Sequence, residues 1–402
     1  MTQKNISQIN DPKNVNRRHF LSTAGAGLAY GMLSSSSAFA ADSISRKRHL
    51  YVTSDRDQTI EIYDINRSHK HLGTFKMNGD KVGGMCADAA TNRYFISQQN
   101  KHTVSAYDLL TGKQLWSVKI LEKYAFKQPD RISITADGSA LYVPVKQNHT
   151  YLVLDPATGE HITEFERPGR PHNSWSGEQG RYMYCAGRSH HVMYMTDQKT
   201  HKVVKKIGPF SWPVRPFAVD REERFIYANT TYTQGFSVGN IKTGETSEVN
   251  LLPPYERTKH WMTSHGGMPH GDHPFSHGIG VRPVTQEVWH LDDLWGYLNV
   301  FDTSKNPAKP KLTGRVELFD DIKKAWNRYK QGEYGTGNRW VAFSIDGKYC
   351  YPSDGSVVDC DAGNKTNFKI VPSEKLFEVE FQGDQAVRVS GQMGGVYGLG
   401  VS

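Results

Sequence analysis

The sequence predicts an all-β protein, a seven-bladed β-propeller with four-stranded blades. The first observation is a strand centred on an aromatic residue, which recurs seven times along the chain. The second is the spacing of these strands, which is 44, 47, 42, 43, 62 and 62 residues and suits one four-stranded blade per copy. The third is a composition of 11% aromatic residues with 37 glycines, which favours strands and tight turns. The seven central aromatic residues are Tyr51, Phe95, Tyr142, Tyr184, Tyr227, Trp289 and Tyr351.

Residues 1–40 are predicted to be an export signal. Arg17 and Arg18 precede an Ala- and Gly-rich apolar stretch, and a small-x-small cleavage site follows at residues 38–40. This order is the pattern of a twin-arginine signal peptide. We therefore expect export to the periplasm or secretion, and a mature chain over residues 41–402 that forms a single propeller.

The first copy of the repeat has too few residues before Tyr51 to form an innermost strand of its own. The tail over residues 376–389 has alternating apolar residues, including Phe377 and Phe381, and can supply that strand. A tail strand that pairs with the first copy would close the ring and remove the open sheet edges.

Two insertions, residues 253–275 and 304–338, interrupt the repeat. The first is rich in Pro, Gly and His, and the second begins Pro-rich and is expected to form a helix from about residue 319 to 330. Both insertions lead into innermost strands, so we expect them to wall the face where those strands begin.

Composition and motifs disfavour several classes of function. The formal net charge of +8 suits an anionic ligand, but no Lys/Arg tract with interleaved aromatic residues supports nucleic-acid binding. No apolar run in the body of the chain approaches the ~20 residues that span a bilayer. No Cys-x-x-Cys-His motif for covalent haem and no Gly-rich phosphate loop is found. Cys350 and Cys360 flank a predicted hairpin and could form a disulfide.

Counting twelve residues back from each central aromatic residue reaches the start of the innermost strand of that blade. If the blades repeat about one axis, these positions form a ring at one face, which we call the axial ring. In the third blade the count could be off by one residue, in which case Arg131 would face the axis in place of Asp130. A ring with two Arg, two His and an Asp is unusual, and it is therefore the candidate site. The axial ring consists of Gly83, Asp130, His172, Arg215, His277 and Arg339.

Strands such as Tyr51-Val52-Thr53 make the mature chain similar to the exported YVTN-repeat propellers. Segments that start at Val214, Ser276 and Phe343 look typical of a bacterial branch of that family. The architecture also resembles the WD40-like, quinoprotein amine dehydrogenase β-chain-like superfamily. A more distant resemblance is to the propeller-type ulvan and rhamnose–glucuronate lyases, which use His, Arg and sometimes Tyr near the central axis. A shared fold does not by itself confer a function.

Arginines beside histidines suit the carboxylate of an acidic sugar. A guanidinium group binds and neutralises the carboxylate, which lowers the cost of removing the adjacent C5 proton. His172 or His277 could abstract that proton, and Tyr232 or the other His could protonate the leaving oxygen, which completes a β-elimination. The expected partner is therefore an anionic oligosaccharide or polysaccharide, and a glycosidase that hydrolyses at the uronate is the alternative to such a lyase. The residues expected to bind it are Arg215, Arg339, Asp130, Arg188 and Lys146.

Several alternatives remain open at the level of sequence. Either axial His could hold strands together, and Asp130 could pair with an axial Arg in an ion-pair network without chemistry. The His-rich insertion could bind Zn or Cu through His265, His270 and His273. Ca is a further possible metal, and no cofactor is certain. The protein could also be a non-catalytic YVTN-type propeller that binds a protein or metal partner, or a redox subunit resembling the amine dehydrogenase heavy chain.

Overall fold

The computed structural model describes residues 46–55, 57–77, 81–123, 128–146, 148–231, 233–251, 276–292, 296–318, 340–391 and 394–398. The chain divides into two units, residues 1–44 and 45–402, and every described element belongs to the second unit. The expected signal peptide, the insertion at residues 253–275 and the expected helix at residues 319–330 lie outside the described residues.

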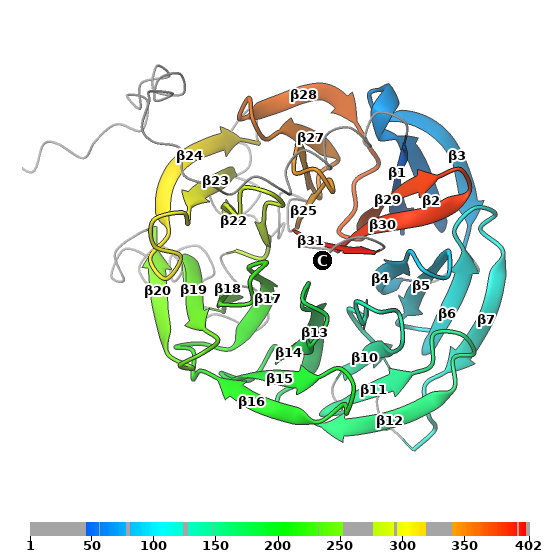
Figure 1. Ribbon diagram of the computed structural model, residues 1–402, viewed down its shortest axis with the longest axis horizontal. Coiled ribbons are helices and arrows are strands. Elements are labelled where there is room, and N and C mark those ends of the chain that lie inside the picture. Colours follow the sequence, from blue (N-terminus) through cyan, green and yellow to red (C-terminus); the bar gives the residue numbers. More distant parts are fainter. Residues whose placement is uncertain are drawn as a thin grey trace, which may run out of the picture. The chain divides into compact units, whose positions relative to one another are not determined.

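The described strands form seven antiparallel sheets that surround a central axis as the blades of a propeller (Figure 1). The innermost strands of blades 1 to 7 are β29 (Leu376–Gln382), β4 (Val82–Asp88), β8 (Gln128–Pro129) with β9 (Ser133–Ile134), β13 (Pro171–Ser176), β17 (Val214–Val219), β21 (Ile279–Val281) and β25 (Val341–Phe343). The second strands are β1 (Lys47–Ser54), β5 (Arg93–Gln98), β10 (Leu141–Lys146), β14 (Tyr182–Gly187), β18 (Phe225–Thr230), β22 (Val288–Asp292) and β26 (Tyr349–Pro352).

Two outer strands complete each four-stranded blade. A short 3-10 helix, η2 (Ile65–Arg67), follows the third strand of blade 1. The third strands are β2 (Thr59–Asp64), β6 (Thr103–Asp108), β11 (Thr150–Leu154), β15 (Met193–Asp197), β19 (Gly235–Asn240), β23 (Tyr297–Asp302) and β27 (Ser356–Asp359). The outermost strands are β3 (Lys70–Lys76), β7 (Gln114–Lys119), β12 (His161–Glu166), β16 (Val203–Ile207), β20 (Thr246–Asn250), β24 (Lys311–Glu317) and β28 (Asn364–Lys369). The predicted seven-bladed β-propeller is thus confirmed.

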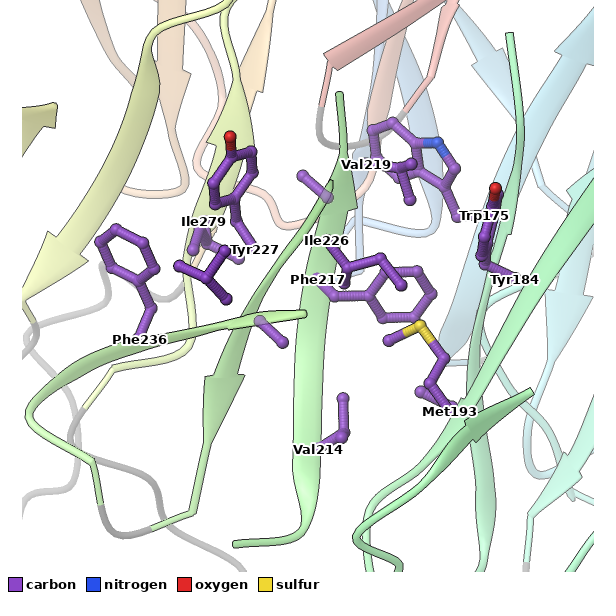
Figure 2. Packing of buried hydrophobic residues seen from close by; sticks show 14 of the residues in the cluster. Trp175, Tyr184, Met193, Val214, Phe217, Val219, Ile226, Tyr227, Phe236 and Ile279 are labelled. Carbon is purple, nitrogen blue, oxygen red and sulfur yellow. The ribbon is translucent and has the colours of Figure 1, made fainter. Parts of the chain in front are cut away.

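The seven central aromatic residues all lie on second strands and are all buried. Tyr227 of blade 5 belongs to an apolar cluster that also contains Tyr184 of blade 4 and Ile279 of blade 6, so the cluster joins neighbouring blades (Figure 2). The hydroxyl groups extend the same contacts, because Tyr51 Oη donates to the Leu109 carbonyl oxygen of blade 2 at 2.8 Å. A buried tyrosine thus contributes apolar area along the blade and a hydrogen bond at its tip.

The C-terminal tail closes the ring as predicted. Strand β29 pairs antiparallel with β1, with Tyr51 opposite Phe377, and the two rings stack with centroids 5.1 Å apart. Arg48 of β1 adds a charged contact, since its Nε lies 2.6 Å from the buried Glu378 Oε1. Blade 1 therefore combines strands from both ends of the described chain.

Two further strands, β30 (Gln385–Gly391) and β31 (Gly394–Gly398), were not predicted. They extend blade 1 inward from β29, and Figure 1 places β31 near the centre of the ring. Tyr397 Oη donates to the Ser176 carbonyl oxygen of blade 4 at 2.7 Å. Gly394 lies so close to blade 6 that a Cβ atom there would be 2.2 Å from the Val281 carbonyl oxygen. This C-terminal hairpin, formed by β30 and β31, therefore lies across the centre of the ring. It contacts the C-terminal ends of the innermost strands β13 and β21.

The cysteines of the described residues are free. Cys350 and Cys360 are both buried in one apolar cluster, and they are not bonded to each other, contrary to the disulfide considered from the sequence. Among the described residues there is also no helix with the length and apolar character needed to cross a membrane.

Candidate functional site

The strand register confirms the count of twelve that defines the axial ring. In each blade the central aromatic residue pairs with the residue three positions after the ring member. The pairs are Cys86 with Phe95, Ser133 with Tyr142, Trp175 with Tyr184, Ala218 with Tyr227, Gly280 with Trp289 and Ala342 with Tyr351. In blade 1, Phe377 pairs with Tyr51, which assigns the seventh ring position to Glu374.

The innermost strands are irregular at these ring positions. The ladders of blades 2, 4 and 5 shift register around Gly83, His172 and Arg215. In blade 3 the innermost strand is broken, so that residues 130–132 separate β8 from β9. A β-bulge frees a residue from regular pairing and re-aims its side chain, and such bulges favour the rims of barrels and functional sites. The irregular backbone therefore coincides with the residues that the repeat singled out.

Asp130 and His172 form a buried pair between blades 3 and 4. His172 Nδ1 lies 2.5 Å from Asp130 Oδ2, and the two residues are 7% and 2% exposed. Burial alone would raise the pKa of Asp130, but the charge and hydrogen bond of His172, with Lys146 and Arg131, lower it to about 2. An ionised carboxylate can only accept, so His172 donates through Nδ1. Asp130 thus holds His172 in the tautomer that carries its proton on Nδ1.

The imidazole of His172 has a lowered pKa. Burial is the main cause, and the positive charges of Arg131 and Arg188 act in the same direction, while Asp130 opposes them. His172 is consequently neutral at neutral pH, with the proton on Nδ1. In the described part of the chain Nδ1 is the ring nitrogen that carries a hydrogen bond, which leaves the Nε2 lone pair for a ligand or a proton.

Arg131 crosses the axis from blade 3. Its backbone N–H donates to the His172 carbonyl oxygen at 3.2 Å, which fixes the base of the side chain beside blade 4. The guanidinium carbon lies 3.9 Å from the centre of the Trp340 ring in blade 7. Nη2 lies 2.8 Å from Glu374 Oε2, at the start of blade 1. Arg131 therefore links blade 3 to blade 4 through its backbone and to blades 7 and 1 through its side chain. Asp130 and Arg131, the two alternatives that the count of twelve left open, both make contacts at this end of the innermost strands.

His277 completes the contacts around the mouth, the face of the ring where the innermost strands begin. Its ring centroid is 6.4 Å from that of His172 and 5.6 Å from that of Trp340. The pKa of Glu374 lies far below its ordinary range, because Arg131, Lys375 and His277 outweigh the opposing effect of burial. Glu374 thus stays ionised and holds Arg131 in place.

Three other predicted ligand-binding residues lie in the described residues. Lys146 ends β10 and its charge lowers the pKa of Asp130, while the charge of Arg188, which follows β14, lowers the pKa of His172. Arg215 starts blade 5 and is 2% exposed, and its Nε donates to Thr231 Oγ1 at 3.2 Å within the same blade. The structure therefore brings Lys146 and Arg188 to the Asp130–His172 pair and places Arg215 at the equivalent position of the next blade.

The remaining predicted site residues lie outside the described residues. They are Tyr232, Arg339 and the metal candidates His265, His270 and His273. Within the described ranges, no group of three or more His, Cys, Asp or Glu residues could hold a metal ion.

Two glycines of blade 2 make room for the segment that carries Asp130 and Arg131. A Cβ atom on Gly83 would lie 2.6 Å from the Pro129 carbonyl oxygen, and one on Gly84 would lie 2.6 Å from Arg131 Cα. Neither distance is compatible with a side chain. Gly83, the glycine of the axial ring, therefore lies where the backbone of blade 3 comes into close contact with blade 2.

Sequence reasoning missed two residues of the mouth, Trp340 and Glu374, and named Arg131 as the alternative to Asp130. The register that gives the ring positions of the other blades also gives Glu374 in blade 1, because Phe377 of the closing strand β29 pairs with Tyr51. The count along the sequence was not extended to this strand. No periodic signal marks Arg131 or Trp340, because their contacts arise from the broken strand in blade 3.

Comparisons with known proteins show the fold alone. No protein-family model matches the chain, and no curated protein matches it. The chain is similar to a solved structure of the dihydro-heme d1 dehydrogenase NirN in complex with DHE, at 14% identity and a TM-score of 0.56, over 85% of this chain and 68% of that one. It is also similar to the hydrazine synthase of Kuenenia stuttgartiensis, at 13% identity and a TM-score of 0.57, over 81% of this chain and 93% of that one. Both likenesses support the β-propeller.

Proposed function

We propose that the mouth of the propeller binds an anionic oligosaccharide or polysaccharide by a uronate carboxylate, and that His172 removes the proton beside that carboxylate. The observation that supports this most is the buried Asp130–His172 pair, with His172 Nδ1 2.5 Å from the carboxylate. Export from the cytoplasm, which residues 1–40 predict, would bring the protein to such polysaccharides.

His172 has the properties that a general base requires. Its lowered pKa keeps the imidazole unprotonated at neutral pH, chiefly through burial. Asp130 holds the proton on Nδ1, so Nε2 is the nitrogen that accepts a proton. As Nε2 takes up that proton, the ionised Asp130 stabilises the imidazolium that forms.

The elimination balances without water or an oxidant. His172 takes the C5 proton, the electron pair forms the C4=C5 double bond, and the C4–O bond breaks. The departing oxygen takes a proton from a second group, for which His277 is placed with its ring centroid 6.4 Å from that of His172. Tyr232, the other expected acid, lies outside the described residues. Each such group contributes about 10²–10⁴-fold.

The cations around the pair suit the carboxylate. Lys146 and Arg188 both influence the protonation of the pair through their charges, which places them near the base. Arg215 is buried at the adjacent ring position. A positive charge near the uronate carboxylate stabilises the negative charge that develops at that end when the C5 proton leaves.

The test follows the ultraviolet absorbance of the unsaturated uronate. The full chain is incubated with a panel of anionic polysaccharides, and the absorbance is compared with that of His172→Ala. A matched control is His161→Ala, on the outermost strand β12 of blade 3. We expect product with the wild type and the control and none with His172→Ala. No product on any uronate polysaccharide, or equal product with His172→Ala, would contradict the proposal and leave a non-catalytic binding propeller.

A haem-type ligand is the second candidate. The similar NirN structure contains DHE, and the mouth offers two imidazoles, of His172 and His277. Imidazole is a common haem ligand, and a His whose other nitrogen donates to a carboxylate is the usual arrangement at metal sites. Haemin added to the full chain would then give a shifted visible spectrum that is lost in His277→Ala. An unshifted spectrum would exclude this candidate.

A further inference from the structure

We propose that Arg131 is the residue that binds the carboxylate of the ligand, in place of the axial arginines that the sequence suggests. This inference rests on the proposed function and names the specificity-determining residue of the same site. It is carried by the fixed geometry of the guanidinium group and by two of its donors that have no hydrogen-bond partner among the described residues.

Three contacts fix the Arg131 side chain across the axis. Its backbone N–H is bonded to the His172 carbonyl oxygen, the guanidinium carbon lies 3.9 Å from the centre of the Trp340 ring, and Nη2 lies 2.8 Å from Glu374 Oε2. The stacking sets the plane of the group, and the carboxylate sets its rotation within that plane. An arginine held in this way loses little side-chain freedom when it binds a ligand.

Two nitrogens of the same group have no hydrogen-bond partner. In the part of the chain that the structure describes, Arg131 is 5% exposed, and Nε and Nη1 are buried without an acceptor. A buried donor left unpaired costs about 1–3 kcal/mol, and more when it is charged. The native site is therefore expected to supply acceptors from outside the protein, and the oxygens of a carboxylate are the acceptors that guanidinium binds most strongly.

The position of Arg131 also suits the chemistry of the neighbouring base. Arg131 directly follows Asp130 in the chain, and its backbone pairs with that of blade 4 beside His172. The charge of Arg131 also acts on His172, so a carboxylate bound by Arg131 is expected close to the imidazole. Nη2 of Arg131 pairs with Glu374, while Asp130 is the partner of His172.

Arg215 is bound differently. Its Nε donates to Thr231 Oγ1 at 3.2 Å, within its own blade. We therefore assign Arg215 to the wall of the site and Arg131 to its centre. The discrimination between an acidic and a neutral sugar then depends on Arg131.

The test measures binding of sodium D-glucuronate to the full chain by calorimetry, with D-glucose as the uncharged counterpart. We expect the wild type to bind glucuronate in preference to glucose and Arg131→Gln to lose affinity for glucuronate by about 30-fold or more. Arg131→Lys keeps a charge but loses the planar donor group, so its loss is expected to be about tenfold. Arg167→Lys is the matched control, because Arg167 is fully buried and donates to main-chain oxygens of Cys185, Pro168 and Val192.

The outcomes separate this inference from the proposed function. Discrimination lost in the two Arg131 variants but kept in Arg167→Lys, with no unsaturated product from any polysaccharide, supports the carboxylate site and removes the elimination. Product formed equally by wild type and Arg131→Gln supports the elimination and overturns the role of Arg131. Wild type that does not prefer glucuronate, or an Arg131→Lys variant within about threefold of wild-type affinity, also overturns it. If Arg131→Gln does not fold, the Arg131→Lys comparison decides the matter.

Discussion

Replacing Asp130 by Asn removes the charged partner of His172 and should make stability depend less on pH. The pKa of Asp130 is lowered from its ordinary value of 3.8 to about 2, because the charge and hydrogen bond of His172 outweigh burial. A carboxyl group with a lowered pKa stabilises the folded state above its unfolded pKa, and this contribution disappears as the pH falls through the folded pKa. Because His172 is neutral at pH 7, the part of this interaction present there is its hydrogen bond to the ionised carboxylate, and a hydrogen bond to a charged group contributes about 1.5–3 kcal/mol.

The assay is urea unfolding followed by tryptophan fluorescence at several pH values between 7 and 2. We expect Asp130→Asn to lower the free energy of unfolding at pH 7 by about 1.5–3 kcal/mol. The difference from wild type should then shrink between about pH 4 and pH 2, where wild-type Asp130 takes up its proton. Asp197→Asn is the control, because Asp197 ends strand β15, is only partly buried, and accepts from the backbone N–H groups of Lys199 and Thr200, which an amide oxygen can replace.

A wild-type advantage that is the same at pH 2 as at pH 7 would refute the assignment of the lowered pKa to Asp130. Equal stability of the two proteins at pH 7 would show that the ionised pair does not stabilise the fold. A loss in Asp197→Asn as large as that in Asp130→Asn would mean that any change of one charge has this effect.

Three further predictions follow from other parts of the ring. The rate of elimination should be constant down to about pH 6.5 and fall only below it, because burial lowers the pKa of His172 and only the unprotonated imidazole acts as the base. A midpoint above pH 6.5 in the pH–rate profile would contradict this prediction. Gly83→Ala should lower the free energy of unfolding by about 1–3 kcal/mol, since its Cβ atom would lie 2.6 Å from a carbonyl oxygen of the next blade, whereas Gly73→Ala, with nothing within 4 Å, should not. Equal urea midpoints for these two variants would argue against the close approach. Tyr397→Phe should cost about 1 kcal/mol, because the Ser176 carbonyl oxygen loses its donor from the C-terminal hairpin, and an unchanged thermal midpoint would show that this bond does not hold the hairpin.

Much of the fold follows from local pattern. Each second strand carries an aromatic residue that has to be buried between blades, and each blade has nearly the same length up to its insertions. The positions of Tyr142 and Tyr184 therefore predict where Asp130 and His172 begin the preceding strands, and the register confirms the count in both blades. The closing strand was predictable for the same reason, since a ring of blades leaves one innermost strand to be supplied by the tail.

Other features of the site do not follow from the repeat. Asp130 was expected to bind the ligand, and the structure shows that it is 2% exposed and that its carboxylate accepts a hydrogen bond from His172. The sequence left Asp130 and Arg131 as alternatives for one position, whereas in the broken innermost strand of blade 3 Asp130 contacts His172 and Arg131 contacts Trp340 and Glu374. The hairpin β30–β31 has no counterpart in the other blades, so no periodic pattern could indicate that it lies at the centre of the ring.

The sequence by itself determined the number of blades, the closure and the positions at which the innermost strands begin, because these depend on burial and spacing within each repeat. Only the tertiary structure decided that Asp130 holds His172 and that Arg131 reaches Trp340 and Glu374. These contacts join blades that are distant in sequence, and they form because side chains from several blades meet at one axis. The reach of each side chain across that axis depends on bulges and close backbone contacts, which no single repeat encodes.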